Sequence, residues 1–72
     1  MRRKEAVNTV RKRLSMTDKK KYRVWGVRSP GACRLIAARI DRADPLLVEI
    51  GRAPSWMEAV IQACSGYMKA TA

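Results

Sequence analysis

The positive charge of this chain is concentrated at one end, and that distribution constrains how the chain can fold. Residues 1–28 contain 11 of the 16 Lys and Arg residues and only two acids, Glu5 and Asp18, so their net charge is +9; residues 29–72 carry only +1. Like charges at this density repel one another and favour an extended or loosely helical segment. We therefore expect the first part of the chain to order when an anionic surface neutralises it.

The composition argues against catalysis. A chain of 72 residues forms one small domain of marginal stability. It contains no His, which is the usual general base at neutral pH and the commonest metal ligand. Cys33 and Cys64 form no CxxC pair and fit best as small buried hydrophobic residues. We expect no enzymatic activity, no catalytic residue, no metal, no cofactor and no small-molecule substrate.

The start of the chain is too polar for a secretory signal peptide, and no apolar run approaches the length of a membrane span. We therefore expect a cytoplasmic protein with reduced thiols. A transit peptide, which the Arg-rich start also resembles, is less favoured because the apolar stripe is narrow.

Local patterns predict a basic N-terminal helix over residues 2–14, with Val7, Val10 and Leu14 on one stripe. An isolated helix of this length is marginal in water, so we expect it to form firmly only when docked or bound. The pattern breaks over residues 15–21, where we place a linker. Residues 1–21 are therefore predicted to be a basic helix or arm, and residues 22–72 a separate small domain.

Within residues 22–72 the patterns predict strand, helix, strand and helix. Residues 22–27 are rich in β-branched and aromatic types, with Arg23, Trp25 and Val27 on one face of the predicted strand. Ser29 and Pro30 fit the start of a helix that ends by residue 44, with an apolar stripe of Cys33, Ile36, Ala37 and Ile40. Residues 46–51 predict a second strand, and Ser55 with Glu58 form a capping box that opens the last helix.

This order predicts an α+β fold (a small α/β unit), in which a basic N-terminal helix or arm precedes a compact β-α-β-α unit. Its two strands are expected to be parallel, because a crossover helix joins them. Parallel sheets normally have both faces covered, so the face away from the helices needs a cover. Three covers are considered: the N-terminal helix folded back over Trp25, Val27 and Leu47, a second copy in a homo-oligomer, or a partner macromolecule.

The charge pattern favours a small nucleic-acid-binding protein that contacts the backbone of DNA or RNA. A net charge of +9 over 28 residues exceeds the magnitude of about 2 to 8 that keeps a small domain soluble. Trp25 or Tyr22 can stack on unpaired bases, although a place in the core or an interface is favoured for both. The candidate nucleic-acid-binding residues are Arg2, Arg3, Lys4, Arg11, Lys12, Arg13, Lys19, Lys20, Lys21, Arg23, Arg28 and Trp25.

The same basic residues are also compatible with other functions. A small basic chain can be a phage or plasmid accessory protein that binds an acidic or nucleoprotein host complex and inhibits it. It can also be a small subunit of a ribonucleoprotein, with its arm ordered by RNA. Binding to a membrane surface is less favoured, because the basic helix lacks Trp and Phe. No helix-turn-helix, zinc-finger or basic-zipper pattern is present, so we expect little sequence specificity.

Overall fold

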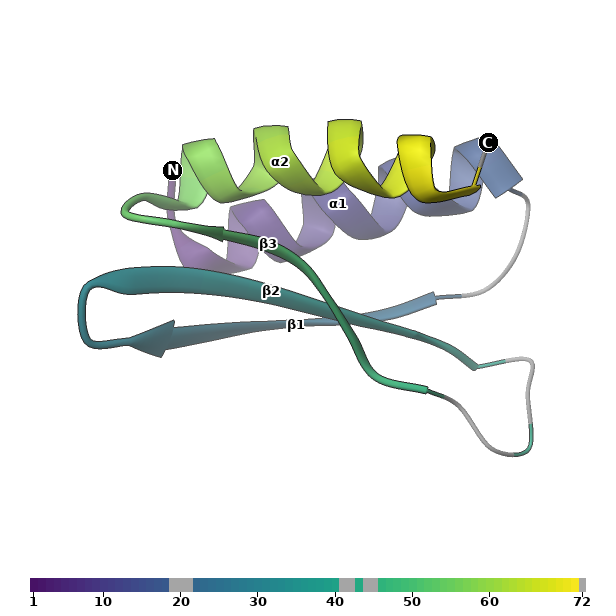
Figure 1. Ribbon diagram of the computed structural model, residues 1–72, viewed down its shortest axis with the longest axis horizontal. Helices are drawn as coiled ribbons and strands as arrows, with labels where there is room; N and C mark the ends of the chain where they lie inside the picture. Colours follow the sequence, from purple (N-terminus) through teal and green to yellow (C-terminus); the bar gives the residue numbers. More distant parts are fainter. Residues whose placement is uncertain (19–21, 41–42, 44–45, 72) are drawn as a thin grey trace.

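The computed structural model shows a three-stranded antiparallel sheet with two helices on one of its faces (Figure 1). The structure describes residues 1–18, 22–40, 43 and 46–71, except the side chains of residues 17–18 and 66–71. Along the chain the elements are α1 (Arg3–Asp18), β1 (Tyr22–Ser29), β2 (Ala32–Arg39), β3 (Val48–Ala53) and α2 (Trp56–Thr71). Residues 15–18, predicted as the start of a linker, belong to α1, and the rest of that predicted linker, residues 19–21, lies outside the described residues.

The segment after Ser29 is a strand, and the helix predicted there is wrong. Ser29 pairs with Ala32, so only Pro30 and Gly31 connect β1 to β2. Gly31 has a φ of 77°, a backbone conformation that favours glycine and that no helix position would accept. Pro followed by Gly suits a tight turn, in which Pro fixes the first φ and Gly supplies the positive one. The two residues therefore form the turn of a hairpin.

The rest of the predicted β-α-β-α unit, with its two parallel strands, is also wrong. A two-residue connection can join only antiparallel strands, so β1 and β2 are not parallel, and β3 then pairs with β2 in the order β1-β2-β3. Cys33, Leu35 and Ala37 alternate into the core with the period of a strand, which replaces the helical stripe. The last strand is Val48–Ala53, so Leu46 and Leu47 precede it and are exposed.

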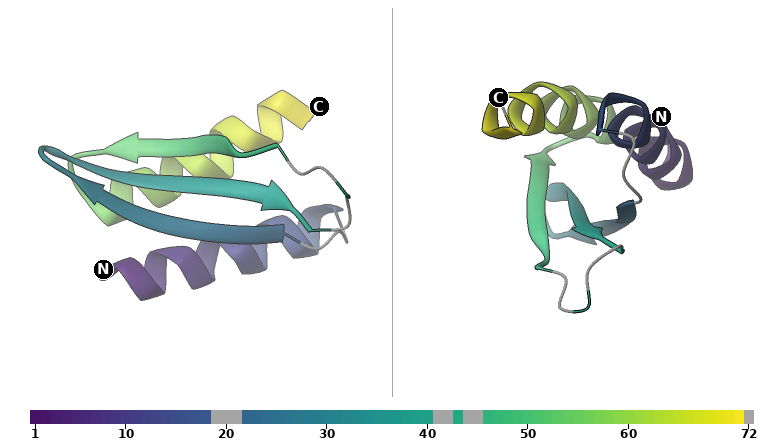
Figure 2. Two further views of the ribbon diagram at one scale, coloured as in Figure 1. Left: turned by 90° about the horizontal axis from the view of Figure 1, so that it is seen from below. Right: turned by 90° about the vertical axis from the view of Figure 1, so that its right-hand side faces the viewer.

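An antiparallel sheet can leave one face in water, so the fold needs no second cover. Both helices pack on the same face of the sheet, with α1 mainly against β1 and α2 mainly against β3 (Figure 2). The predicted outward positions Arg23, Trp25 and Val27 lie on the open face, and their exposure confirms the predicted alternation of β1. The N-terminal helix does fold back, but onto the opposite face from Trp25 and Val27.

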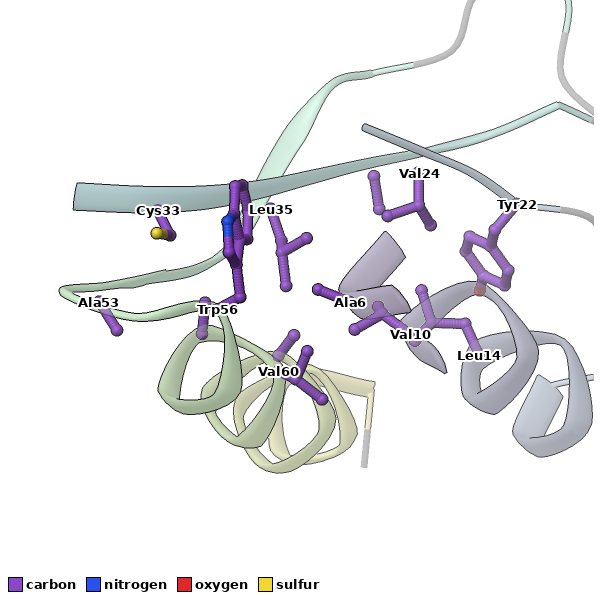
Figure 3. Close-up of a cluster of buried hydrophobic side chains, with 13 residues drawn as sticks. Ala6, Val10, Leu14, Tyr22, Val24, Cys33, Leu35, Ala53, Trp56 and Val60 are labelled. Atoms are coloured by element: carbon purple, nitrogen blue, oxygen red, sulfur yellow. The ribbon is translucent and has the colours of Figure 1, made fainter. Parts of the chain in front are cut away.

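The core lies between the sheet and the two helices. Ala6, Val10 and Leu14 recur every four residues along α1 and are almost fully buried, which places one stripe of the helix against the sheet. Figure 3 shows this stripe facing Tyr22 and Val24 of β1. The same buried cluster includes Leu35 of β2 and four α2 residues, Trp56, Ala59, Val60 and Ala63. Helix α1 therefore contributes to the core that the other elements share.

The capping box predicted at the start of α2 is confirmed. The Ser55 hydroxyl accepts a hydrogen bond from the Glu58 backbone N–H at 3.3 Å and donates one to Glu58 Oε2 at 3.1 Å. The first of these bonds satisfies an N–H group that has no partner inside the helix, and the second orients the Ser55 hydroxyl. They fix the start of α2 next to Ala53, the buried end of β3.

Two glycines allow the helices to approach the sheet closely. A Cβ atom added to Gly51 of β3 would overlap the backbone carbonyl oxygen of Ala59 in α2. A Cβ atom added to Gly26 of β1 would lie 2.7 Å from Cγ of Arg3 and 3.0 Å from Cγ2 of Val7. At Gly51 an added Cβ atom would meet the rigid backbone of α2. At Gly26 the nearest atom to an added Cβ belongs to the long side chain of Arg3.

We expect Gly51→Ala to destabilise the protein more than Gly26→Ala. At Gly51 the helix itself must move away from the sheet, and overpacking of this kind costs about 1–3 kcal/mol. At Gly26 rotation of Arg3 relieves much of the overlap, so the loss should be about 1 kcal/mol or less. Urea unfolding followed by circular dichroism measures both. Equal stability of Gly51→Ala and the wild type would contradict the close packing of α2 on β3.

Candidate nucleic-acid interface

Helix α1 has an apolar side in the core and a basic side in solvent. Because its buried stripe holds the helix against the sheet, the cations of the opposite side have fixed positions on the surface. The exposed basic residues of this region are Arg2, Arg3, Lys4, Arg11, Lys12 and Arg13. Within the described ranges, Arg2, Arg3, Lys4 and Lys12 form no ion pair with a carboxylate. Their charges are therefore available to an external anion.

A groove runs between the first half of α1 and strand β1. It has a volume of about 470 Å³ and is lined by Arg3, Lys4, Val7, Asn8, Val24, Trp25 and Gly26. Residues 3–8 come from one flank of α1, and residues 24–26 from β1, which is an edge strand of the sheet. Among the described residues, the lining includes two cations and Trp25 but no carboxylate. We call this hollow the α1–β1 groove.

A second hollow lies beside the later part of α1. It has a volume of about 540 Å³ and is lined by Arg11, Lys12, Ser15, Met16, Tyr22 and Ile40. The Arg11 guanidinium donates a hydrogen bond of 2.8 Å to the Asn8 side-chain oxygen, and Asn8 belongs to the α1–β1 groove. Arg11 and Asn8 thus connect the two hollows along the same flank of the helix.

On the open face of the sheet, a cation and an aromatic ring lie together. The Arg23 guanidinium lies over the Trp25 ring, 5.7 Å from its centre, within the range of a cation–π interaction. Trp25 is 37% exposed, so of the two places favoured for it, the core is wrong and an interface stays a prediction. Tyr22 is 5% exposed, and its predicted place in the core is confirmed. The sheet alternation separates these two aromatics onto opposite faces.

Arg34 and Arg52 on the open face share one carboxylate, so their cluster keeps a net charge of +1. Glu49 of β3 accepts from the Arg34 guanidinium at 2.8 Å, and Arg52 lies 3.0 Å away from its other oxygen. The hydrogen bond from Arg34 and the charge of Arg52 hold the pKa of the Glu49 carboxyl below its ordinary value of 4.5, against an opposing effect of desolvation. Among the described residues, cations without a carboxylate partner therefore lie on α1 and β1, whereas Arg34 and Arg52 are ion-paired.

The structure brings together about half of the predicted binding residues. Arg3, Lys4, Arg11, Lys12 and Trp25 line the two hollows, and Arg23 adjoins them through Trp25. Arg2, Arg13 and Arg28 are exposed but line neither hollow. Lys19, Lys20 and Lys21 lie outside the described residues.

Sequence reasoning missed Asn8, Val24 and Gly26 as lining residues. Their place in the groove depends on the contact between α1 and β1, which no local pattern indicates. Asn8 alone had a sequence signal, because it precedes Arg11 by three residues and side chains at that spacing meet on a helix.

Comparison of the chain with protein families, curated proteins and solved structures gives no match. Neither described helix has the length and apolar character needed to cross a membrane. In the part of the chain that the structure describes, no group of three His, Cys, Asp or Glu side chains could hold a metal ion. Both cysteines are free, with Cys33 buried and Cys64 partly buried.

We expect the Glu49 cluster to contribute to stability only above acidic pH. A carboxyl whose pKa is lowered by folding stabilises the folded state while it is ionised, and that contribution is lost as the pH falls below 4.5. Thermal unfolding of the wild type and of Glu49→Gln from pH 7 to pH 3 measures it. The effect should be small, because the cluster is at the surface. The difference between the two unfolding midpoints should shrink as the pH falls, and a constant difference across the range would contradict this role of Glu49.

Proposed function

We propose that this protein binds nucleic acid without catalysis and contacts mainly the phosphate backbone. The observation that carries this proposal is the flank of α1, where cations without carboxylate partners border two hollows whose described lining residues include no acid. Phosphate contacts by Lys and Arg release condensed counterions and supply most of the affinity of non-specific binders. Both DNA and RNA offer this backbone.

The proposed contacts follow the helix and the edge strand. Arg3, Lys4, Arg11 and Lys12 come from α1 and Arg23 from β1, which gives five cations along one side of the molecule. Arg2, Arg13 and Arg28 belong to the same proposal as peripheral cations. Lys19, Lys20 and Lys21 belong to it on the sequence alone. The reduced state of Cys33 and Cys64 suits a cytoplasmic protein.

We expect a steep dependence of affinity on salt. If five cations contact phosphates, log K should fall with log salt at a slope of about −4.5 for a duplex and about −3.5 for a single strand. The corresponding loss between about 50 and 200 mM salt is several-hundred-fold for the duplex and roughly 100-fold for the single strand. Fluorescence anisotropy with labelled oligonucleotides, measured over a salt series, gives these slopes.

A pair of double variants with the same net charge tests the position of the contacts. Lys4→Gln with Lys12→Gln should reduce the slope by about 1.4 to 1.8. Arg34→Gln with Arg52→Gln removes the same two charges on the β3 side and should leave the slope nearly unchanged. Equal slopes for the two variants would show that net charge alone drives binding and would contradict the proposed surface. No binding to any polyanion at low salt would contradict the function itself.

A further inference from the structure

We propose that the Trp25 ring stacks on an unpaired base, so that the ligand of this surface is single-stranded nucleic acid. This inference rests on the proposed function and adds the class of ligand to it. It follows from three features of the β1 edge: a ring that is 37% exposed, the Arg23 guanidinium over it, and a groove that Trp25 lines together with residues of α1.

The place of Trp25 in the sheet limits the positions that its ring can take. Trp25 lies within a strand, between Val24 and Gly26, and its cross-strand neighbour on the open face is the partly buried Ile36. Arg23 lies over the ring, so a base that stacks on the remaining exposed surface adds to an existing cation–aromatic pair. A ring whose position is already fixed loses little conformational freedom on binding.

Phosphates next to that base would meet the cations of α1. Trp25 is one of the residues that line the α1–β1 groove, so a strand that passes from the ring around the β1 edge would meet Arg3, Lys4 and Asn8. The nearest described carboxylate of the open face, Glu49, is already held by Arg34 and Arg52. No described residue that lines the groove between the ring and the helix is acidic.

The same features disfavour a duplex. Within a duplex each base is stacked on both of its faces, so it cannot place a face on Trp25 unless it is first extruded. Single-strand binders combine cations that follow the backbone with aromatic rings on which bases stack. A duplex could use only the cations of this surface, and the ring would add nothing to its affinity.

The test compares three ligands of equal length: a single-stranded oligonucleotide, a duplex, and an abasic strand that keeps the phosphates but lacks bases. Trp25→Leu should weaken binding to the single strand by roughly 5- to 150-fold, the range that corresponds to the loss of one stacked base. Its affinity for the duplex and for the abasic strand should stay unchanged. Trp25→Phe keeps an aromatic ring and should retain most of the affinity for the single strand.

Tryptophan fluorescence gives an independent readout. Trp56 is buried, so quenching by the single strand would report on Trp25, and this quenching should be absent with the abasic strand and in Trp25→Leu. Circular dichroism checks that both variants fold.

The outcomes separate this inference from the proposed function. If all three ligands bind with steep salt dependence but Trp25→Leu has no effect, or weakens all three equally, the stacking role is overturned while backbone binding stands. If no ligand binds at low salt, both proposals fail.

Discussion

The docking of α1 onto the sheet through Ala6, Val10 and Leu14 is the contact on which the rest of the molecule depends. It completes the core above β1 and, at the same time, fixes the orientation of a helix rich in Lys and Arg. An isolated helix of this composition would be marginal in water, but burial of its apolar stripe supplies the stability that its propensity lacks. The cations then need no partner within the protein to be held in place.

The Pro30–Gly31 turn determines which face of the sheet is exposed to solvent. Because it makes β1 and β2 antiparallel, both helices can lie on one face and leave the other face in water. Trp25 and Arg23 are exposed for that reason, and β1 is left at the edge of the sheet beside α1. The groove and the aromatic ring thus meet where one helix borders one edge strand.

Sequence patterns were informative where the signal was local. The N-terminal helix, the alternation of β1 and the capping box at Ser55 each depend on spacings within a few residues, and all are found in the structure. Residues 32–39 were mispredicted because Ala, Leu and Arg favour helices and Ser29 with Pro30 resembles a helix start. Strand pairing overrode that propensity, and the positive φ of Gly31 decided the turn. The cations of the site could be predicted from the distribution of charge along the sequence. The groove could not, because it depends on a contact between α1 and β1 that only the folded chain creates.

Chemical-shift mapping by NMR tests the central claim most directly, because it locates the bound surface on the folded protein. On titration of the ¹⁵N-labelled protein with a single-stranded oligonucleotide, we predict that amide shifts change along α1 and β1, with the largest changes near Asn8 and Trp25. Amides near the exposed Met57 and Ile61 of α2 should stay unchanged. Changes centred on α2 or β3, or none at low salt, would contradict the account.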